Sequence, residues 1–381
     1  MLVSDPSPGP TAATYLRRRA VAVGSLAVAL AAVVGILVSV SGAGGAPASG
    51  AGGAPAKRRA AAPPRGPVTI AWVGDITPGS AMGVPPGDGR VQFVHVRRFL
   101  RSADLAFGNL EGTYSTGGAS KCAGEGGRAC YAFQAPPDHA RALRRAGFDA
   151  VNLANNHAWD YGATGQAQTT AALRRVRVRA TGRPREIVVL RRHGLRIALV
   201  GFAAYPWANA IGDLAGARAL VRRAATRADL VVVAMHAGAE GADQTHVPRG
   251  TEMAFGENRG DSRAFAHAVI GAGADLVVGS GPHVIRGVER YRGRLIAYSL
   301  GNFAGWSNFG LGGTLSESGI FKVTLNAAGR PAAAHWIPIR LTGPGIPELD
   351  RSRASRKLAA ELSKQDFGRA AGMICPRCAS T

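Results

Sequence analysis

The sequence is poor in acidic residues and in lysine. Its 381 residues include 24 Asp and Glu against 46 Lys and Arg, and arginine supplies most of the formal net charge of +22. A charge of this size attracts polyanions, and the sign alone does not choose among anionic lipid, surface polymer and nucleic acid. The sequence also lacks basic runs interleaved with aromatic residues, and it lacks RNP-type, zinc-finger and helix-turn-helix signatures. We therefore expect no nucleic-acid partner.

One stretch, residues 20–40, contains no charged residue. Its length is about the 20 residues that a helix needs to cross a hydrocarbon core, and arginines at 17–19 precede it directly. The positive-inside tendency then predicts a single-pass anchor with a cytoplasmic N-terminus and the main domain outside the membrane. A cleavable signal peptide ending near Ala46-Pro47-Ala48 is the alternative, and it would secrete the same domain.

Composition divides the chain into five segments. Residues 41–67 are rich in Gly, Ala and Pro, which is typical of a flexible linker. We therefore expect a cytoplasmic segment at 1–19, the anchor at 20–40, the linker at 41–67, a folded domain at 68–345, and a C-terminal helix with a Cys-x-x-Cys tail at 346–381.

Cysteine is scarce. Cys122 and Cys130 bracket a glycine-rich loop, and Cys375 and Cys378 form a C-P-R-C motif close to the C-terminus. In an exported protein this even number predicts two local disulfides, Cys122–Cys130 and Cys375–Cys378. A zinc site built from all four is the alternative, although only one pair has the short spacing that zinc knuckles use.

From residue 68 onward, short apolar runs alternate with Ala- and Arg-rich amphipathic stretches, which predicts an α/β domain with largely buried strands. Strands are expected at 68–73, 105–108, 150–153, 195–201, 230–235, 276–279 and 295–300. Helices are expected at 93–101, 137–145, 162–174, 217–227 and 263–271. The last two strands, 319–325 and 333–341, flank a turn-like segment at 326–331 and are expected to pair antiparallel.

Polar residues stand just past the carboxyl ends of five predicted strands: Asp75, Glu111, Asn156 with His157, His236, and His283. Taken singly, each has a structural explanation as a cap, a turn residue or a loop acid. Ligands of open α/β sheets bind at this edge, so we expect these side chains to converge. Carboxylate and amide oxygens mixed with imidazoles suit Mn, Fe or Zn, which activate water and polarise phosphoryl or carbonyl groups.

Six motifs in consistent order resemble those of the CapA family, which is associated with poly-γ-glutamate capsule synthesis. They are V-G-D-I at 73–76, N-L-E at 109–111, N-L-A-N-N-H-A-W-D-Y-G at 152–162, M-H-A-G-A-E at 235–240, G-P-H-V at 281–284 and G-R-L-I-A-Y-S-L-G-N-F at 293–303. The resemblance implies a metallophosphoesterase-like sandwich of two mixed sheets flanked by helices, preceded here by the transmembrane helix.

The resemblance also implies roles for individual residues. The ligands of one or two divalent ions would be Asp75, Glu111, Asn156, His236 and His283. His157 resembles the histidine that protonates a leaving oxygen in phosphoesterases, with Asp160 as its orienting partner. A purely structural His157–Asp160 pair is the alternative.

The chain departs from the family pattern at Ser280-Gly281, where relatives commonly carry a further histidine close before Pro-His. The site therefore holds a single ion, uses water or Ser280 in that place, or has lost catalysis. Charged residues in and after the His236 loop either line a substrate groove or, for the last three, form a surface salt-bridge cluster: Glu240, Glu257, Arg259 and Asp261.

Two functions remain open. The resemblance favours a component that helps to synthesise, retain or transport an anionic polymer of the poly-γ-glutamate type, with other capsule-synthesis membrane proteins as partners. The predicted site favours a metal-dependent hydrolase that acts on a phosphoester of an envelope or exported substrate.

Overall fold

The computed structural model describes residues 65–124 and 130–372, which belong to one compact unit, Ala60–Thr381. The predicted segments at 1–19 and 20–40, nearly all of the linker, and the Cys375–Cys378 pair lie outside the described residues. Within 65–124 and 130–372, no helix has the length and apolar composition that crossing a membrane requires.

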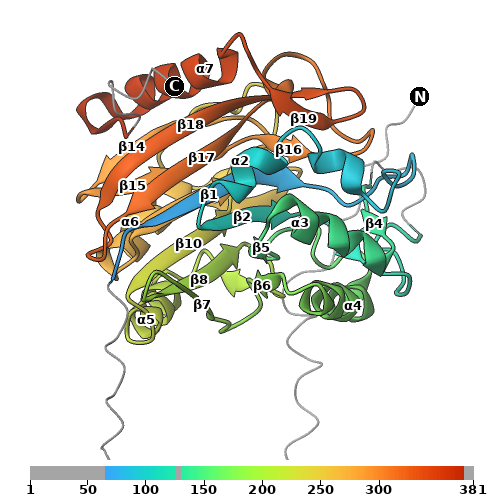
Figure 1. Cartoon of the computed structure of the whole chain (residues 1–381), viewed down its shortest axis with the longest axis horizontal. Helices are drawn as coiled ribbons and strands as arrows, with labels where there is room; N and C mark the ends of the chain where they lie inside the picture. Colours follow the sequence, from blue (N-terminus) through green and yellow to red (C-terminus); the bar gives the residue numbers. More distant parts are fainter. Residues whose placement is uncertain (1–64, 125–129, 373–381) are drawn as a thin grey trace, which may run out of the picture. The chain divides into compact units, whose positions relative to one another are not determined.

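Two mixed β-sheets form the centre of the described unit (Figure 1). The first contains β1 (Val68–Ile76), β2 (Leu105–Leu110), β5 (Ala150–Asn152), β6 (Arg179–Thr181), β16 (Asn302–Ala304), β17 (Glu317–Leu325), β18 (Pro331–Thr342) and β19 (Ile346–Leu349). The second contains β7 (Val188–Arg192), β8 (Leu195–Ala203), β9 (Asn209–Ala210), β10 (Leu230–His236), β13 (Leu276–Ser280), β14 (Val288–Tyr291) and β15 (Arg294–Ala297).

Each sheet has a parallel block that carries the predicted strand ends. In the first sheet, β1, β2, β5 and β6 run parallel, whereas β17, β18 and β19 continue from β1 in antiparallel order. In the second sheet, β8, β10, β13 and β15 run parallel between the antiparallel edges β7 and β14. Parallel strands point their carboxyl ends to one edge, so each block gathers its following loops there.

The inner faces of the two sheets bury a common apolar core. Strand β10 reads LVVVAMH and is buried throughout, as expected for a parallel strand covered on both faces. Ile70 and Phe107 from the first sheet share this core with Leu199 and Val232 from the second.

Helices cover the outer faces of both sheets. The α-helices are α2 (Arg97–Arg101), α3 (Ala140–Ala146), α4 (Gly162–Arg175), α5 (Leu214–Ala225), α6 (Ser262–Gly271) and α7 (Ala354–Phe367). The 3₁₀ helices are Arg90–Phe93, Pro137–His139, Gly313–Ser316 and Gly368–Ala370. Helices α2, α3 and α4 pack on the first sheet, and α5 and α6 pack on the second. The predicted α/β class, with two mixed sheets flanked by helices, is confirmed.

Helix α7 closes the edge of the core between the sheets. It contacts β17 and β18 of the first sheet and β14 of the second, and it lies along these strands in Figure 1. Leu362 and Ala359 enter the core between the sheets, and Ser363 Oγ accepts a hydrogen bond of 2.8 Å from Val288 N on β14. Helix α7 is therefore packed against the same core as the central strands.

Several predicted elements differ in their bounds. The helix expected at 93–101 is a 3₁₀ turn, Arg90–Phe93, followed by the short helix α2, because Val94–Val96 form turns between them. The strand expected at 295–300 ends at Ala297. The predicted antiparallel pair near the C-terminus is confirmed as β17 and β18. The apolar pattern of the sequence does not predict the short strands, which include the pairs β3 (Thr113–Tyr114) with β4 (Gln134–Ala135) and β11 (Glu252–Ala254) with β12 (Glu257–Gly260).

Candidate metal centre

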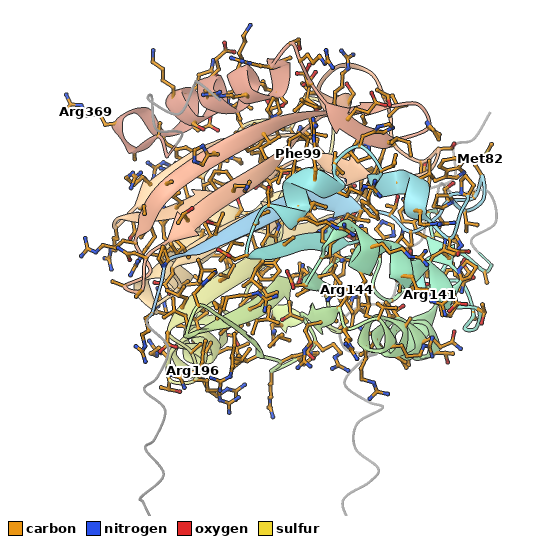
Figure 2. All side chains as sticks on the ribbon, in the orientation of Figure 1. Met82, Phe99, Arg141, Arg144, Arg196 and Arg369 are labelled. Carbon is orange, nitrogen blue, oxygen red and sulfur yellow. A yellow bond between two sulfur atoms is a disulfide. The ribbon has the colours of Figure 1, made fainter. Side chains whose placement is uncertain are left out.

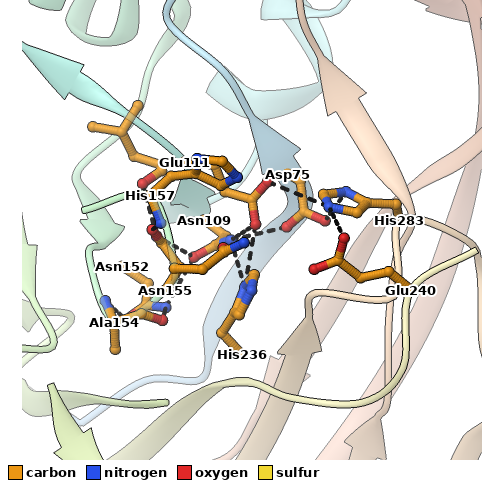
Figure 3. A network of polar contacts seen from close by, with 12 residues as sticks. Asp75, Asn109, Glu111, Asn152, Ala154, Asn155, His157, His236, Glu240 and His283 are labelled. Carbon is orange, nitrogen blue, oxygen red and sulfur yellow. Dashed lines mark hydrogen bonds and ion pairs between the residues drawn. The ribbon is translucent and has the colours of Figure 1, made fainter. Parts of the chain in front are cut away.

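Asn109 on β2 is the hydrogen-bond hub of the polar cluster in Figure 3. Its Nδ2 donates to Asp75 Oδ1 at 2.9 Å and to Glu111 Oε1 at 3.2 Å. Its Oδ1 accepts from Asn152 Nδ2 at 3.0 Å and from Asn155 Nδ2 at 3.2 Å. Asn109 is not among the site residues predicted from the sequence. Strand alternation could have indicated it, because positions 109 and 111 lie on the same face. One buried amide thus sets the spacing between the two carboxylates.

Glycine makes the approach of β16 to β1 sterically allowed. A Cβ on Gly74 would lie 1.8 Å from the carbonyl oxygen of Gly301, so no larger residue fits there. Asp75 N donates to that same carbonyl at 3.1 Å, and Asp75 pairs with Asn302 across the two strands. The glycine of the V-G-D-I motif therefore allows Asp75 to lie beside Asn302, more than two hundred positions away in the chain.

The second sheet contributes two histidines. His236 ends β10, and its Nδ1 lies 3.2 Å from Glu111 Oε1. His283 follows β13 with φ of +61°, an uncommon conformation for a residue other than glycine. Its Nδ1 lies 2.9 Å from Asn302 Oδ1 and 3.2 Å from Asp75 Oδ2. The loop conformation thus brings the His283 ring against the carboxylates of the first sheet (Figure 3).

The geometry brings four of the five predicted ligands together. Ligand atoms of Asp75, Glu111 and His236 all lie within 4.8 Å of one another, and all three residues are buried. His283 joins them through Asp75, and its Nε2 is 3.8 Å from Glu111 Oε2. This buried Asp/Glu/His group has the composition and spacing of a metal-binding site.

The unpaired polar atoms of the cluster indicate whether a cation fits between its side chains. Four buried atoms from the predicted ligand set have no hydrogen-bond partner among the described residues: Asp75 Oδ2, Glu111 Oε2, Asn156 Oδ1 and His236 Nε2. Buried polar atoms are nearly always satisfied, so unsatisfied ones call for an explanation. Asp75, Glu111 and His236, whose ligand atoms lie close together, offer carboxylate oxygens and an imidazole nitrogen, and these donors suit Mn, Fe or Zn. The residues present therefore fit a divalent cation.

Two adjacent buried carboxylates, Asp75 and Glu111, shift the pKa values of the ionisable groups in the cluster. Burial and the neighbouring Asp75 charge raise the pKa of Glu111 well above its ordinary value. Burial acts to lower the pKa of His283, but the carboxylates of Glu111 and Asp75 outweigh it and raise that pKa to about 10. Burial lowers the pKa of His236 well below its ordinary value. His236 is therefore neutral at pH 7, the form in which an imidazole binds a metal.

Asn156, the predicted metal ligand, and its neighbour Asn155 have different environments in the structure. Asn155 belongs to the hydrogen-bond network, since its Nδ2 donates to Asn109 Oδ1 and, at 2.8 Å, to the carbonyl of Leu110. The Asn156 side chain stays outside that network and keeps its buried oxygen unpaired. Its role as a metal ligand stays a prediction, as do the roles predicted for the other site residues.

His157 is held by Asp160 of its own loop, and residues of a separate loop contact Asp160 in turn. Its Nδ1 lies 2.9 Å from Asp160 Oδ2, and Lys121 Nζ contacts Asp160 Oδ1 at 2.7 Å. Phe133 N donates to Asp160 Oδ2 at 2.7 Å, and the Phe133 ring lies 4.4 Å from the His157 ring between centroids. Burial lowers the pKa of His157, while Asp160 opposes that effect. The arrangement orients the imidazole and stabilises it.

A disulfide joins Cys122 to Cys130, as predicted. It excludes the alternative zinc site built from four cysteines, because two of the proposed ligands are bonded to each other. Lys121 precedes the first cysteine, and Phe133 follows the second by three positions. The disulfide therefore joins the two ends of the loop whose residues Lys121 and Phe133 contact Asp160. The spacing of the cysteines in the sequence does not reveal this connection.

Gly281 belongs to the Ser280-Gly281 pair, at which the sequence departs from the predicted family pattern. Its φ is +115°, a conformation that other residues rarely adopt, and a Cβ there would lie 3.3 Å from His236 Nε2. A side chain at this position would crowd the backbone of Ala237 as well as the His236 ring. The backbone conformation at position 281 therefore disfavours a residue larger than glycine.

The predicted salt bridge between Glu257 and Arg259 is present, but the arginine is buried, whereas the Glu257 side chain is 51% exposed. Arg259 is only 3% exposed and pairs with Glu240 at 2.6 Å and with Glu257 at 3.2 Å. Asp261 takes no part, because its carboxylate caps α6 by accepting from Ala264 N at 2.8 Å. Glu240 Oε2 lies 3.6 Å from His283 Nε2, so this cluster borders the candidate metal centre.

Comparisons with known proteins match the part of the chain that holds the cluster. A family model described as "Bacterial capsule synthesis protein PGA_cap" matches residues 69–306. The capsule biosynthesis protein CapA of Bacillus anthracis is 29% identical over 299 residues, which are 71% of this chain and 67% of that protein. The PGA biosynthesis protein CapA of Bacillus subtilis is 28% identical over 236 residues, 56% of this chain and 57% of that protein. The resemblance to the CapA family is confirmed.

Among solved structures, an NAD nucleotidase of Haemophilus influenzae is similar with a TM-score of 0.42 and 13% identity, over 78% of this chain and 56% of that one. The chain thus spans about two thirds or less of the length of each of these three proteins.

We predict that Glu111→Gln stabilises the cation-free protein at pH 7 by on the order of 1 kcal/mol, because an amide carries no charge to desolvate beside Asp75. The gain should vanish below the ordinary glutamate pKa of 4.5, where the wild-type carboxyl is protonated in both folded and unfolded chains. A divalent cation at about 100 times its Kd should stabilise the wild type by about 2.7 kcal/mol and leave Glu111→Gln unchanged. Chemical denaturation with chelator and with cation measures both effects.

Glu317→Gln is the matched control, because burial also raises the pKa of Glu317 and its Oε2 is also unpaired. Glu317 lies on β17 and is outside the set of predicted ligands. This variant should keep the full response to the cation. Two outcomes contradict the prediction. Glu111→Gln would be less stable than the wild type without cation, or the cation would stabilise it as much as it stabilises the wild type.

Replacing Lys121 by methionine should raise the pKa of His157. The Lys121 ammonium opposes a positive imidazole, and its removal also leaves the Asp160 carboxylate free to favour the imidazolium. NMR titration of the histidine ring signals in the presence of chelator measures this shift. Lys322→Met is the control, because it removes a lysine that contacts Ser102 instead of Asp160. An unchanged or lowered His157 pKa would show that Lys121 does not act on this pair.

Proposed function

Since the chain belongs to the bacterial capsule synthesis protein family PGA_cap, we propose that it takes part in synthesis, retention or transport of an anionic surface polymer of the poly-γ-glutamate type. The observation that carries this proposal is the family match, which spans every predicted ligand of the metal centre. Relatives named for capsule and PGA biosynthesis support it. The substrate and partners of this chain are part of the proposal.

The charge of the chain supports an anionic partner. With a formal net charge of +22, the protein attracts polyanions over long range, and such attraction raises the rate of encounter with a charged polymer. Poly-γ-glutamate carries one carboxylate per residue, so it has the complementary sign. Other capsule-synthesis membrane proteins are the further partners that we propose.

We place the main domain outside the cytoplasmic membrane and propose residues 20–40 as its anchor. The uncharged length of this segment and the arginines at 17–19 support a single pass with a cytoplasmic N-terminus. The disulfide between Cys122 and Cys130 is consistent with an oxidising compartment. Secretion after cleavage would give the domain the same location.

A second candidate function is hydrolysis of a phosphoester on an envelope or exported substrate, in a metallophosphoesterase-like fold. The unpaired buried atoms of the predicted ligands favour it, because a purely structural cluster would satisfy its own donors and acceptors. Asp75, Glu111, Asn156, His236 and His283 would hold one or two ions of Mn, Fe or Zn. A bound cation of this kind supplies Lewis-acid polarisation and lowers the pKa of water.

The side chains of the chain itself would then position the reacting groups. Asp160 binds Nδ1 of His157, which fixes the imidazole so that Nε2 is left to exchange a proton with a substrate oxygen. Asn109 holds Asp75 and Glu111 at a constant separation, so the ligands need little rearrangement on binding. Phosphoester turnover by the purified protein with Mn, Zn, Fe or Mg, absent in Glu111→Gln, is the result that this candidate requires.

The polymer function predicts the phenotype of a deletion. Cells that lack the chain should lose cell-bound anionic polymer, measured as the amount and length of polymer retained on washed cells and released to the medium. The wild-type gene should restore both quantities. Complementation with Glu111→Gln separates the candidates, because a catalytic role predicts failure and a binding role predicts rescue. Unchanged polymer in the deletion strain would refute the polymer function.

The location predicts which side of the membrane can be labelled. A cysteine introduced at the exposed residue Met82 should react with a membrane-impermeant thiol reagent in intact cells, because Met82 belongs to the proposed extracytoplasmic domain. A cysteine introduced at Ser7, in the proposed cytoplasmic segment, is the control and should react only after lysis. Reaction of Met82→Cys only after lysis would place the domain in the cytoplasm.

A further inference from the structure

A second feature, separate from the candidate metal centre, is a pocket of about 460 Å³ on the outer side of the first sheet. The 3₁₀ helix Arg90–Phe93, helix α2 and helix α3 enclose it. The residues that line it are Arg90, Val91, Phe93, Val94, Arg97, Arg101, Ala142, Arg145 and Ala146. None of these residues takes part in the metal centre, so the pocket is an independent feature.

Four arginines and no carboxylate line this pocket. In the described part of the chain, none of the four forms an ion pair. The nearby Asp138 is engaged by Arg141 at 3.4 Å and does not line the pocket. Within the same described residues, the guanidinium groups of Arg97 and Arg145 have no hydrogen-bond partner, whereas Arg101 Nη2 donates to the carbonyl of Arg145. The pocket thus concentrates positive charge that the protein itself does not neutralise.

The floor of the pocket is apolar. Phe93, Ala142 and Ala146 are buried, and Val94 is 43% exposed although it is aliphatic. Figure 2 shows neighbouring arginines of α3, with Arg141 and Arg144 labelled, at the surface of the molecule. A ligand that fits must present anions to the rim and methylene groups to the floor. Guanidinium groups bind carboxylates in pairs of parallel hydrogen bonds, which favours regularly spaced carboxylates on an aliphatic backbone.

We infer that this pocket binds a segment of a polycarboxylate chain, with Arg97 and Arg145 as its principal anion contacts. The inference rests on the proposed function and deepens it, because it gives the anionic polymer a defined site on the protein. The polymer would be held by α2 and α3, away from the predicted ligands, so binding does not require the metal centre.

A second arginine-lined pocket provides a matched control. Arg218, Arg222 and Arg292 line a pocket of about 410 Å³ between α5 and α6, on the other sheet. Arg292 there lies over the ring of Tyr291, and His267 in that pocket is paired with Glu289 at 2.9 Å. This pocket has a similar volume but lacks the buried aromatic floor. Loss of two charges there tests whether net charge alone explains binding.

The experiment measures binding of a fluorescent, short γ-linked oligoglutamate to the full chain in detergent by fluorescence anisotropy. The double variant Arg97→Gln with Arg145→Gln should bind at least about tenfold more weakly, because it loses two charge-assisted contacts. The double variant Arg218→Gln with Arg222→Gln should change the Kd by less than about twofold, since screened charges at a distance contribute little. Val94→Asp, which keeps all four arginines, should also weaken binding through repulsion at the floor.

Circular dichroism establishes that each variant is folded, and the four substituted arginines are all exposed. Equal weakening by both arginine pairs would overturn the inference in favour of nonspecific attraction. Binding that neither the Arg97/Arg145 pair nor Val94→Asp affects would overturn it while leaving the proposed function intact. If the wild-type chain does not bind oligoglutamate at all, direct polymer binding fails with it. Equal, pocket-dependent affinity for polyphosphate would refute the preference for carboxylates.

Discussion

The burial of two neighbouring carboxylates is the constraint on which the site depends. Asp75 and Glu111 are both 0% exposed, and among the described residues each has an oxygen without a hydrogen bond, although His283 Nδ1 lies 3.2 Å from Asp75 Oδ2. Negative charge in a low-dielectric interior is costly unless it is paired, so the surrounding groups respond to it. The pKa of Glu111 rises well above its ordinary value, and the pKa of His283 rises to about 10. A divalent cation would neutralise this buried negative charge, and the stability of the fold would then depend on how much of the protein has bound the cation.

The fold maintains this arrangement through rigid elements on one side and a closed loop on the other. Asn109 lies in the middle of the first sheet and bonds both carboxylates, so their separation follows from strand geometry. His157 depends instead on Asp160, which Lys121 and Phe133 hold from the loop that the disulfide closes. Sites built on strands are more precise than sites built on loops.

The candidate metal centre and the arginine-lined pocket carry charges of opposite sign. At the metal centre, buried carboxylates attract cations, and Arg259 is neutralised by Glu240 and Glu257. At the pocket between α2 and α3, the exposed arginines form no ion pair with any carboxylate of the described residues. A basic protein attracts an anionic chain at long range, but retention at one place requires a concave surface with unpaired guanidinium groups. The two sites would therefore act on a polymer in different ways.

The sequence by itself determined the α/β class and the strand ends from which Asp75, Glu111, His236 and His283 arise. Apolar runs of strand length encode burial, and parallel strands carry the residues that follow them to a common edge. Only the tertiary structure decided the lateral neighbours: Asn109 between the carboxylates, Glu240 beside His283, Lys121 against Asp160, and the four arginines around one pocket. Local periodicity specifies which face of an element is buried. It does not specify which distant loop packs against that face, because that follows from the packing of the whole chain.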